Sequence, residues 1–104
     1  MLKKRFRLNT SEFKEVFNFG QTSRGPLFLV KKRENGLKFS RYAVVVSKKI
    51  SKKAFERNYL KRRFMHALGE RGGMFPKADY IFVLNSSAKD VEYKDLLTSL
   101  DVIK

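Results

Sequence analysis

The chain has 104 residues, of which 42% are hydrophobic, and its ten Phe and four Tyr exclude a basic disordered tail. Its 24 Lys and Arg against 10 Asp and Glu give a formal net charge of +14, and the lack of Cys excludes disulfides and Cys-ligated zinc. We therefore expect one domain over residues 1–104 and a polyanionic partner, because so much like charge opposes folding.

The sequence shows no segment with the length of a membrane span. Its longest apolar run, Tyr42 to Val46, is far shorter than the ~20 residues required, and no apolar segment follows the charged N-terminus as in a signal peptide. We expect a cytoplasmic protein that binds nucleic acid. An anionic membrane surface is the less favoured partner, because the apolar residues are needed for a core.

The first predicted element is a helix over Thr10–Phe19. Asn9 and Glu12 have the spacing of a capping box, and Gly20 is a natural stop. Apolar residues recur at i, i+3 and i+4, namely Phe13, Val16 and Phe17. This spacing gives the helix one apolar face.

Two strands are predicted next, over Leu27–Lys32 and Leu37–Ser47. Asn35-Gly36 between them is typical of a type I′ hairpin turn, so we expect the two strands to pair. Three consecutive Val near the end of the second strand indicate burial on both faces.

A basic helix is predicted over about Lys53–Leu68, then a buried strand over Ala78–Leu84 and a last helix within Ala88–Leu100. The order α-β-β-α-β-α predicts an α/β (α+β) two-layer sandwich, in which helices pack on a small mixed sheet.

The basic helix and the turn before it concentrate the charge. Ser47–Arg63 holds eight cations and one acid, Glu56, which is half of the net charge in seventeen residues. A solvated helix laced with salt bridges would alternate the signs of its charges. One face of this helix is cationic in its first half, with Lys53 and Arg57, and apolar afterwards. We interpret the cationic part as a phosphate-binding surface.

Asn58 is unfavourable in the middle of a helix. Its side-chain amide is therefore expected to bond either a nucleotide or a neighbouring backbone group, and the sequence leaves both interpretations open.

The segment Val44–Arg63, VVVSKKISKKAFERNYLKRR, resembles the signature of the protein component of bacterial ribonuclease P. In that family a Ser-Lys-Lys turn after a strand leads into a helix with an Arg-Asn-Arg core and further cations. The matching residues are Arg57, Asn58, Lys61 and Arg62. Tyr59 departs from the usually basic third position, where its ring can stack on a base or sugar. Phe13–Gly20 and the strand ADYIFVL also resemble the family, so the likeness covers nearly the whole chain.

The resemblance implies a ribonucleoprotein whose large RNA subunit carries the catalytic centre and requires Mg²⁺, while the protein itself binds no cofactor. That enzyme removes the 5′ leader of precursor tRNA by hydrolysing a phosphodiester bond. The protein is expected to bind the catalytic RNA, one protein per RNA, together with the leader, and to lower the Mg²⁺ requirement. The family's fold has a left-handed β-α-β crossover through the basic helix, against the right-handed rule.

The resemblance also implies two sets of site residues. The surface for the catalytic RNA is expected at Lys48, Lys49, Lys52, Lys53, Arg57, Asn58, Tyr59, Lys61 and Arg62. The leader site, in a cleft between the first helix and the sheet, is expected at Phe13, Phe17, Phe28 and Lys31. Lys31 stands where some members have a Tyr, so an ionic contact is expected there. Aromatic residues four apart are also typical of a core, and both interpretations of Phe13 and Phe17 stay open.

The sequence offers no catalytic centre of its own. His66 is the sole histidine, the ten acids are dispersed, and there is no Gly-rich phosphate loop. We expect no catalytic residue and no metal ligand in this chain, so that it is enzymatic only within the holoenzyme. The main alternative is a structural RNA-binding protein of ribosomal type. A basic DNA-binding protein and a free-standing nuclease are further alternatives.

Overall fold

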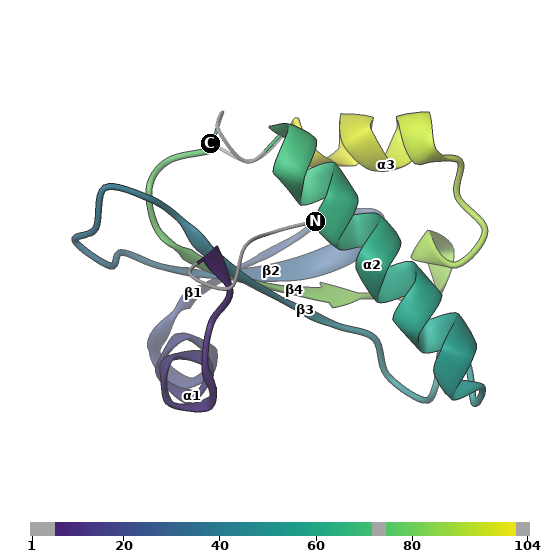
Figure 1. Cartoon of the computed structure of the whole chain (residues 1–104), viewed down its shortest axis with the longest axis horizontal. Coiled ribbons are helices and arrows are strands. Elements are labelled where there is room, and N and C mark those ends of the chain that lie inside the picture. The colour runs from purple at the N-terminus through teal and green to yellow at the C-terminus, as the bar shows by residue number, and fades with distance from the viewer. Residues whose placement is uncertain (1–5, 72–74, 102–104) are drawn as a thin grey trace.

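The computed structural model describes residues 6–71 and 75–101, and Figure 1 shows their arrangement. The elements are α1 (Thr10–Phe19), β1 (Gln21–Arg24), β2 (Phe28–Arg33), β3 (Arg41–Val45), α2 (Ala54–Arg71), β4 (Asp79–Leu84), the 3-10 helix η3 (Ser86–Ala88) and α3 (Tyr93–Leu100). The three predicted helices are present, and both ends of the first are confirmed.

The strands form a mixed sheet in the order β1-β2-β4-β3. β2 pairs antiparallel with β1 and with β4, whereas β3 pairs parallel with β4. The chain passes from β3 to β4 through α2, in the left-handed crossover that the resemblance implied. This connection lays the basic helix across one face of the sheet, beside α3 (Figure 1).

The turn at Asn35-Gly36 does not join a hairpin, so that prediction was wrong. Gly36 has the positive φ of such a turn, 67°, but β4 lies between the two strands that the turn was expected to pair. The Asn35 side chain instead shapes a longer connection. It accepts from Leu37 N–H (2.8 Å) and donates to the Phe39 carbonyl (3.2 Å).

The strand β1 was not predicted, because its four residues are polar and all of them are exposed. It begins directly after α1, and Gly20 makes this connection possible. A Cβ on Gly20 would lie 2.5 Å from the Val16 carbonyl oxygen and 3.1 Å from that of Lys32. Any side chain there would push the end of the helix away from β2.

The main core lies between the sheet and the helices α2 and α3. The apolar half of the α2 face is buried as predicted, at Leu60, Phe64, Ala67 and Leu68. Phe64 packs on Phe82 and Phe28, with ring centroids 5.1 and 5.6 Å away. On that same face Lys53 is exposed and Arg57 is half-buried, so the cationic turns extend beyond the core.

The helix α1 lies on the opposite face of the sheet (Figure 1). Val16 is its one buried residue, at 1% exposure. The predicted capping box is confirmed, because Asn9 Oδ1 accepts from Glu12 N–H and Glu12 Oε1 accepts from Asn9 N–H, both at 2.8 Å. Local hydrogen bonds therefore define the start of α1 more than burial does.

Candidate nucleic-acid interface

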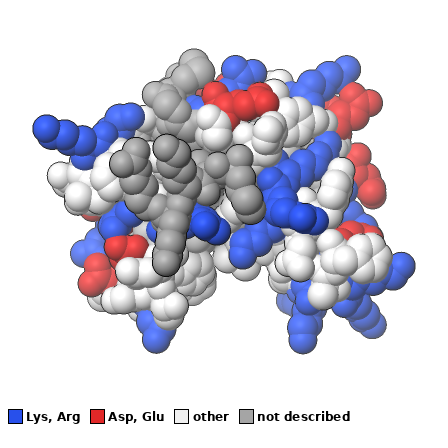
Figure 2. Space-filling view, viewed as in Figure 1, with Lys and Arg blue, Asp and Glu red and all other residues white. Residues whose placement is uncertain are grey.

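A groove of about 1310 Å³ runs along β3, between the first turns of α1 and one side of α2. In Figure 2 the surface is hollowed along its lower edge, between the lobe of α1 and the start of α2. The lining along β3 is apolar: Ala43, Val45 and Val46 are half-buried there, and Val44 lies between them with its side chain in the core. An apolar floor between polar walls fits a single nucleic-acid strand, whose bases can lie on the floor while its phosphates meet the cations.

The α1 wall carries a pair of stacked aromatic rings. Phe13 lines the groove, and Phe17 stacks on it with ring centroids 5.9 Å apart and planes 13° apart. Phe17 is 46% exposed, so this pair lies outside the main core. Lys31 Nζ lies 4.6 Å from the centre of the Phe17 ring and donates to the Phe17 carbonyl (3.0 Å). Three of the predicted leader residues thus meet in one cluster, of which Phe13 lines the groove and Phe17 and Lys31 lie behind it.

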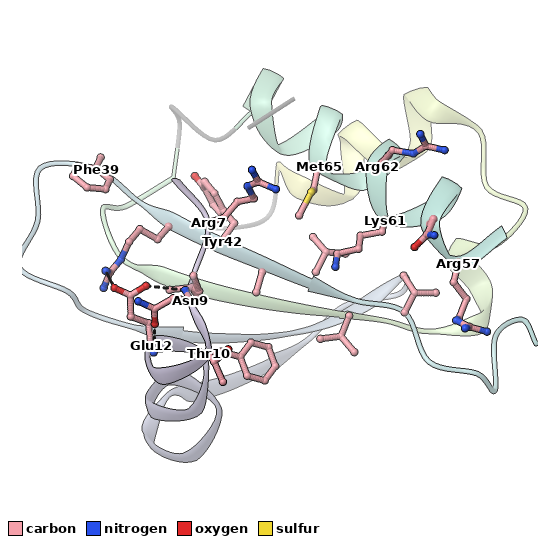
Figure 3. Close-up of a pocket in the computed structure, with 18 of the residues that line it drawn as sticks. Arg7, Asn9, Thr10, Glu12, Phe39, Tyr42, Arg57, Lys61, Arg62 and Met65 are labelled. Carbon is pink, nitrogen blue, oxygen red and sulfur yellow. Dashed lines mark hydrogen bonds and ion pairs between the residues drawn. The ribbon is translucent and has the colours of Figure 1, made fainter. Parts of the chain in front are cut away.

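The α2 wall carries the signature residues of the basic helix. Arg57, Asn58, Lys61 and Arg62 all line the groove. Figure 3 shows Arg57 and Lys61 across β3 from Asn9 and Glu12 at the start of α1. Arg57 Nη1 donates to the Ser51 carbonyl (3.0 Å), which holds its guanidinium against the turn before the helix. Asn58 is exposed on this wall, so its amide is accessible to a ligand in the groove.

The four lysines of the turn before α2 lie on a second, smaller concavity of about 390 Å³. It is lined by Lys48, Lys49, Lys52 and Lys53, together with Glu56 and Lys89. Lys89 forms an ion pair with Glu56 (3.1 Å), and hydrogen bonds from Lys89 and Ser51 hold the pKa of Glu56 below its ordinary value. The predicted basic surface therefore has two parts, the groove wall and this concavity, and Figure 2 shows Lys and Arg around the start of α2.

The structure does not bring Phe28 to this surface. Its side chain is 2% exposed and packs on Phe64 and Phe82, in the core on the far side of the sheet from α1. Tyr59 is 56% exposed on α2 but is not among the residues that line the groove. The resemblance to the family predicted both residues near RNA, whereas the alternation along β2 could have indicated that Phe28 faces the core.

Several residues of these surfaces were missed by the sequence analysis, among them Arg7, Phe39 and Arg41 in the groove. Phe55 is 71% exposed and lines the groove one helical turn before Asn58, so its spacing to the signature could have revealed it. Lys89 joins the turn lysines only through the fold, since η3 brings it beside Glu56. No sequence pattern connects Lys89 with that turn.

Within residues 6–71 and 75–101, no group of three or more Asp, Glu or His side chains is placed to hold a metal ion. No helix in the same part of the chain is long and apolar enough to cross a membrane.

Comparison with known proteins identifies the family. The model of the family described as Ribonuclease P matches residues 2–103. The chain belongs to the ribonuclease P protein family. It is 33% identical over 98 residues to the ribonuclease P protein component of Chromobacterium violaceum. The alignment covers 92% of this chain and 79% of that protein. It is 28% identical over 100 residues to the component of Streptococcus thermophilus, with 95% and 89% covered.

Solved structures of ribonuclease P proteins share this fold. The protein from Thermotoga maritima superposes with a TM-score of 0.80 at 28% identity, covering 90% of each chain. The protein from Staphylococcus aureus also superposes with a TM-score of 0.80, and the match covers 94% of this chain and 91% of that protein. Because the two sequences are only 23% identical, this match shows a likeness of fold alone. The chain is therefore an RNA-binding subunit of ribonuclease P, the holoenzyme that processes the 5′ leader of tRNA, and a catalytic RNA is its partner.

Proposed function

We propose that the two basic surfaces divide the RNA between them: the groove binds the single-stranded leader of precursor tRNA, and the turn before α2 binds the catalytic RNA. The observation that carries this proposal is the groove itself, which has Phe13 of α1 on one wall and the cations of α2 on the other, across an apolar floor. The Phe13 ring also stacks on Phe17, which lies next to the groove lining. Bases stacking on aromatic rings in a positive groove are held with little sequence preference. A leader-binding site needs that tolerance if leaders differ in sequence.

On the α1 side, Phe13 and Phe17 supply the stacking surface. Their rings are nearly parallel, so a base can extend the stack, at about 1–3 kcal/mol per base. Lys31 lies over Phe17 and is placed to meet a phosphate next to the stacked base. Phe28 is left out of this proposal because its ring is buried.

On the other side, the concavity before α2 offers several exposed ammonium groups, which suit the phosphate backbone of a folded RNA. Lys48, Lys49, Lys52, Lys53 and Lys89 are its cations. Tyr59 and Arg62 are exposed on α2 and extend this contact toward the groove. Arg57, Asn58 and Lys61 lie between the two RNAs, and each can contact either of them.

This arrangement supports a role in lowering the Mg²⁺ requirement. Catalytic RNA and precursor tRNA repel each other, and cations of the protein placed between them replace part of the metal-ion screening. We propose one protein per catalytic RNA, acting in the cytoplasm. The chemistry supplied by Mg²⁺ belongs to the RNA, and residues of this chain bind and orient the two strands.

The test is 5′ processing of a precursor tRNA at ~1–5 mM Mg²⁺, a salt range in which phosphate neutralisation is strong. The arms are the catalytic RNA alone, this protein alone, and both together. Cleavage at low Mg²⁺ is expected only with both. It should be lost when Arg57→Ala is combined with Asn58→Ala, and retained with Lys94→Ala, which removes one exposed cation from α3.

Two results would contradict the proposal. If the RNA has the same Mg²⁺ dependence with and without the protein, then the chain is a structural RNA-binding protein. Cleavage by the protein alone would place the chemistry in this chain.

A further inference from the structure

A chain of polar contacts connects the interior of the sheet with the first turn of α1. At its centre Asp79, on β4, is 5% exposed. Its carboxylate accepts from Arg41 on both oxygens, at 2.8 Å from Nε and 2.7 Å from Nη2, and Oδ1 also accepts from Asn35 Nδ2 (2.8 Å). A bidentate pair with a third donor fixes the plane of the guanidinium.

The third nitrogen of the same guanidinium reaches α1. Arg41 Nη1 donates to Glu12 Oε2, while Glu12 Oε1 accepts from Asn9 N–H in the capping box. One carboxylate thus joins the helix cap to β3, and β3 is joined in turn to β4. Asn9 and Glu12 appear in Figure 3 with their hydrogen bonds, on the wall of the groove.

We infer that Arg41, held by Asp79 and acting through Glu12, is the positioning group that sets the α1 wall of the groove against its β3 floor. Phe13 follows Glu12 directly in the sequence, so a displacement of the cap displaces the ring that lines the groove. The inference rests on the proposed leader function of the groove. Arg41 and Asp79 need not touch RNA in this role, because they hold in place the helix turn that carries the aromatic ring.

Burial separates this network from an ordinary surface ion pair. The side chains of Arg41 and Asp79 are 19% and 7% exposed, and that of Glu12 is 28% exposed. In the other described ion pair between α1 and the sheet, Arg33 and Glu15 are 41% and 65% exposed. Exposed pairs contribute little because water and salt screen them. Hydrogen bonding to Asp79, opposed by burial, raises the pKa of Arg41, so its charge is retained at any pH at which the protein is folded.

Alternative anchors for this end of α1 are few. Val16, the buried residue of the helix, lies near its other end, one turn before Gly20. The Lys31 contact is with the Phe17 carbonyl, also near that end. Among the described residues, Glu12 and the hydrogen bond from Leu8 N–H to the Tyr42 carbonyl (2.9 Å) join the capping turn to β3. The segment just before the turn is also joined to this part of the chain, by the Arg7–Tyr42 bridge and the Phe6–Phe39 ring contact.

The chain provides a matched pair of variants. Glu12→Gln keeps an oxygen for the capping box but replaces the oxygen that meets Arg41 with an amide. Glu15→Gln makes the same change in charge three residues later on the same helix, at the exposed Arg33 pair. Both variants make the protein more positive by one charge, so nonspecific attraction for RNA should rise slightly and equally in both.

The measurement is binding of the reconstituted holoenzyme to a precursor tRNA with a non-hydrolysable scissile bond, and to the same tRNA without its leader. The ratio of the two dissociation constants measures how much the leader contributes to binding. We expect Glu12→Gln to reduce the gain in affinity that the leader provides by roughly threefold to tenfold, because the aromatic wall is no longer preorganised. Glu15→Gln should leave the ratio unchanged, and thermal unfolding should show that both variants are folded.

A second readout does not use RNA. Hydrogen exchange of the amides in the first turns of α1 should be faster in Glu12→Gln than in Glu15→Gln. Equal exchange and equal binding ratios in the two variants would overturn the positioning role. Phe13→Leu tests the proposed function separately: if it leaves the binding ratio unchanged, the groove does not bind the leader. If it lowers the ratio while Glu12→Gln does not, the proposed function holds and the inference fails.

Discussion

The helices α1 and α2 lie on opposite faces of one sheet and are held there by different forces. α2 buries five residues in the main core, namely Leu60, Phe64, Met65, Ala67 and Leu68. α1 buries Val16 alone and is otherwise joined to the sheet by polar contacts from Glu12, Glu15 and the Phe17 carbonyl. The groove between them thus has one wall anchored by apolar burial and one held mainly by ion pairs.

This difference explains how one small protein can present so much positive charge. The core beneath the second half of α2 stabilises the helix, so its first turns are free to carry cations at the surface. α1 needs little apolar area, so Phe17 remains 46% exposed and Phe13 only half-buried, and in the proposed function both rings meet the leader. As a consequence, the α1 wall depends on polar contacts more than on buried apolar area.

The largest expected effect is on stability, and it compares the core residues that hold α2 with the one that holds α1. Phe64→Ala should lower the free energy of unfolding by about 3–5 kcal/mol, because it leaves a cavity among packed aromatic rings. Val16→Ala should cost only about 1–2 kcal/mol, by the loss of two buried methyl groups, and should loosen α1 selectively. Urea unfolding measures the totals, and hydrogen exchange shows which helix is affected. Similar losses in both variants would mean that α1 is anchored as firmly as α2.

A smaller effect concerns charge. Replacing Lys52 and Lys53 by Ala should weaken binding to the catalytic RNA and reduce the slope of log K against log salt by roughly 0.7–0.9 for each phosphate that the protein no longer neutralises. Lys14→Ala removes an exposed cation from α1 and should leave that slope nearly unchanged. Filter binding over a series of salt concentrations distinguishes the two. An equal change for Lys14→Ala would mean that the attraction comes from net charge, without a defined surface.

A further effect concerns pH in the core beneath α2. Burial, with a smaller contribution from Tyr42, raises the pKa of Tyr80 to about 12, and its hydroxyl donates to the Pro76 carbonyl (2.6 Å). As pH rises from about 10 to about 12, the unfolded chain loses the tyrosine proton before the folded protein does. The free energy of unfolding should therefore fall across this window, and fall less in Tyr80→Phe. Denaturant unfolding of both proteins from pH 9 to 12 measures this difference, and parallel curves would contradict it.

Short sequence patterns were sufficient to predict the elements that are stabilised by interactions between residues close together in the chain. The capping box, the helical spacing of apolar residues and Gly20 determined α1 to the residue, since all three act within one or two turns. The apolar half of the α2 face followed from its period, and the basic signature from its residue types. The strand β1 could not be found in this way, because its four residues are polar and form a strand only by pairing with β2.

Strand order was the main failure. A positive-φ glycine at Gly36 is a local property and was predicted, but which strands pair depends on where α2 returns the chain, and β4 enters between β2 and β3. The same crossover decides the site. It places Asn58 across a groove from Phe13, brings Lys89 beside Glu56, and turns Phe28 into the core.

The sequence by itself determined the positive charge, the helices and the residue types that can meet RNA, because these properties depend on composition and on neighbours a few positions away. Only the tertiary structure decided which of those residues share a surface. Residues such as Glu12, Arg41 and Asp79 are separated by 29 and 38 positions along the chain, and their ion pairs exist because the sheet brings three elements together. Contacts between distant residues follow from packing, which no short stretch of sequence contains.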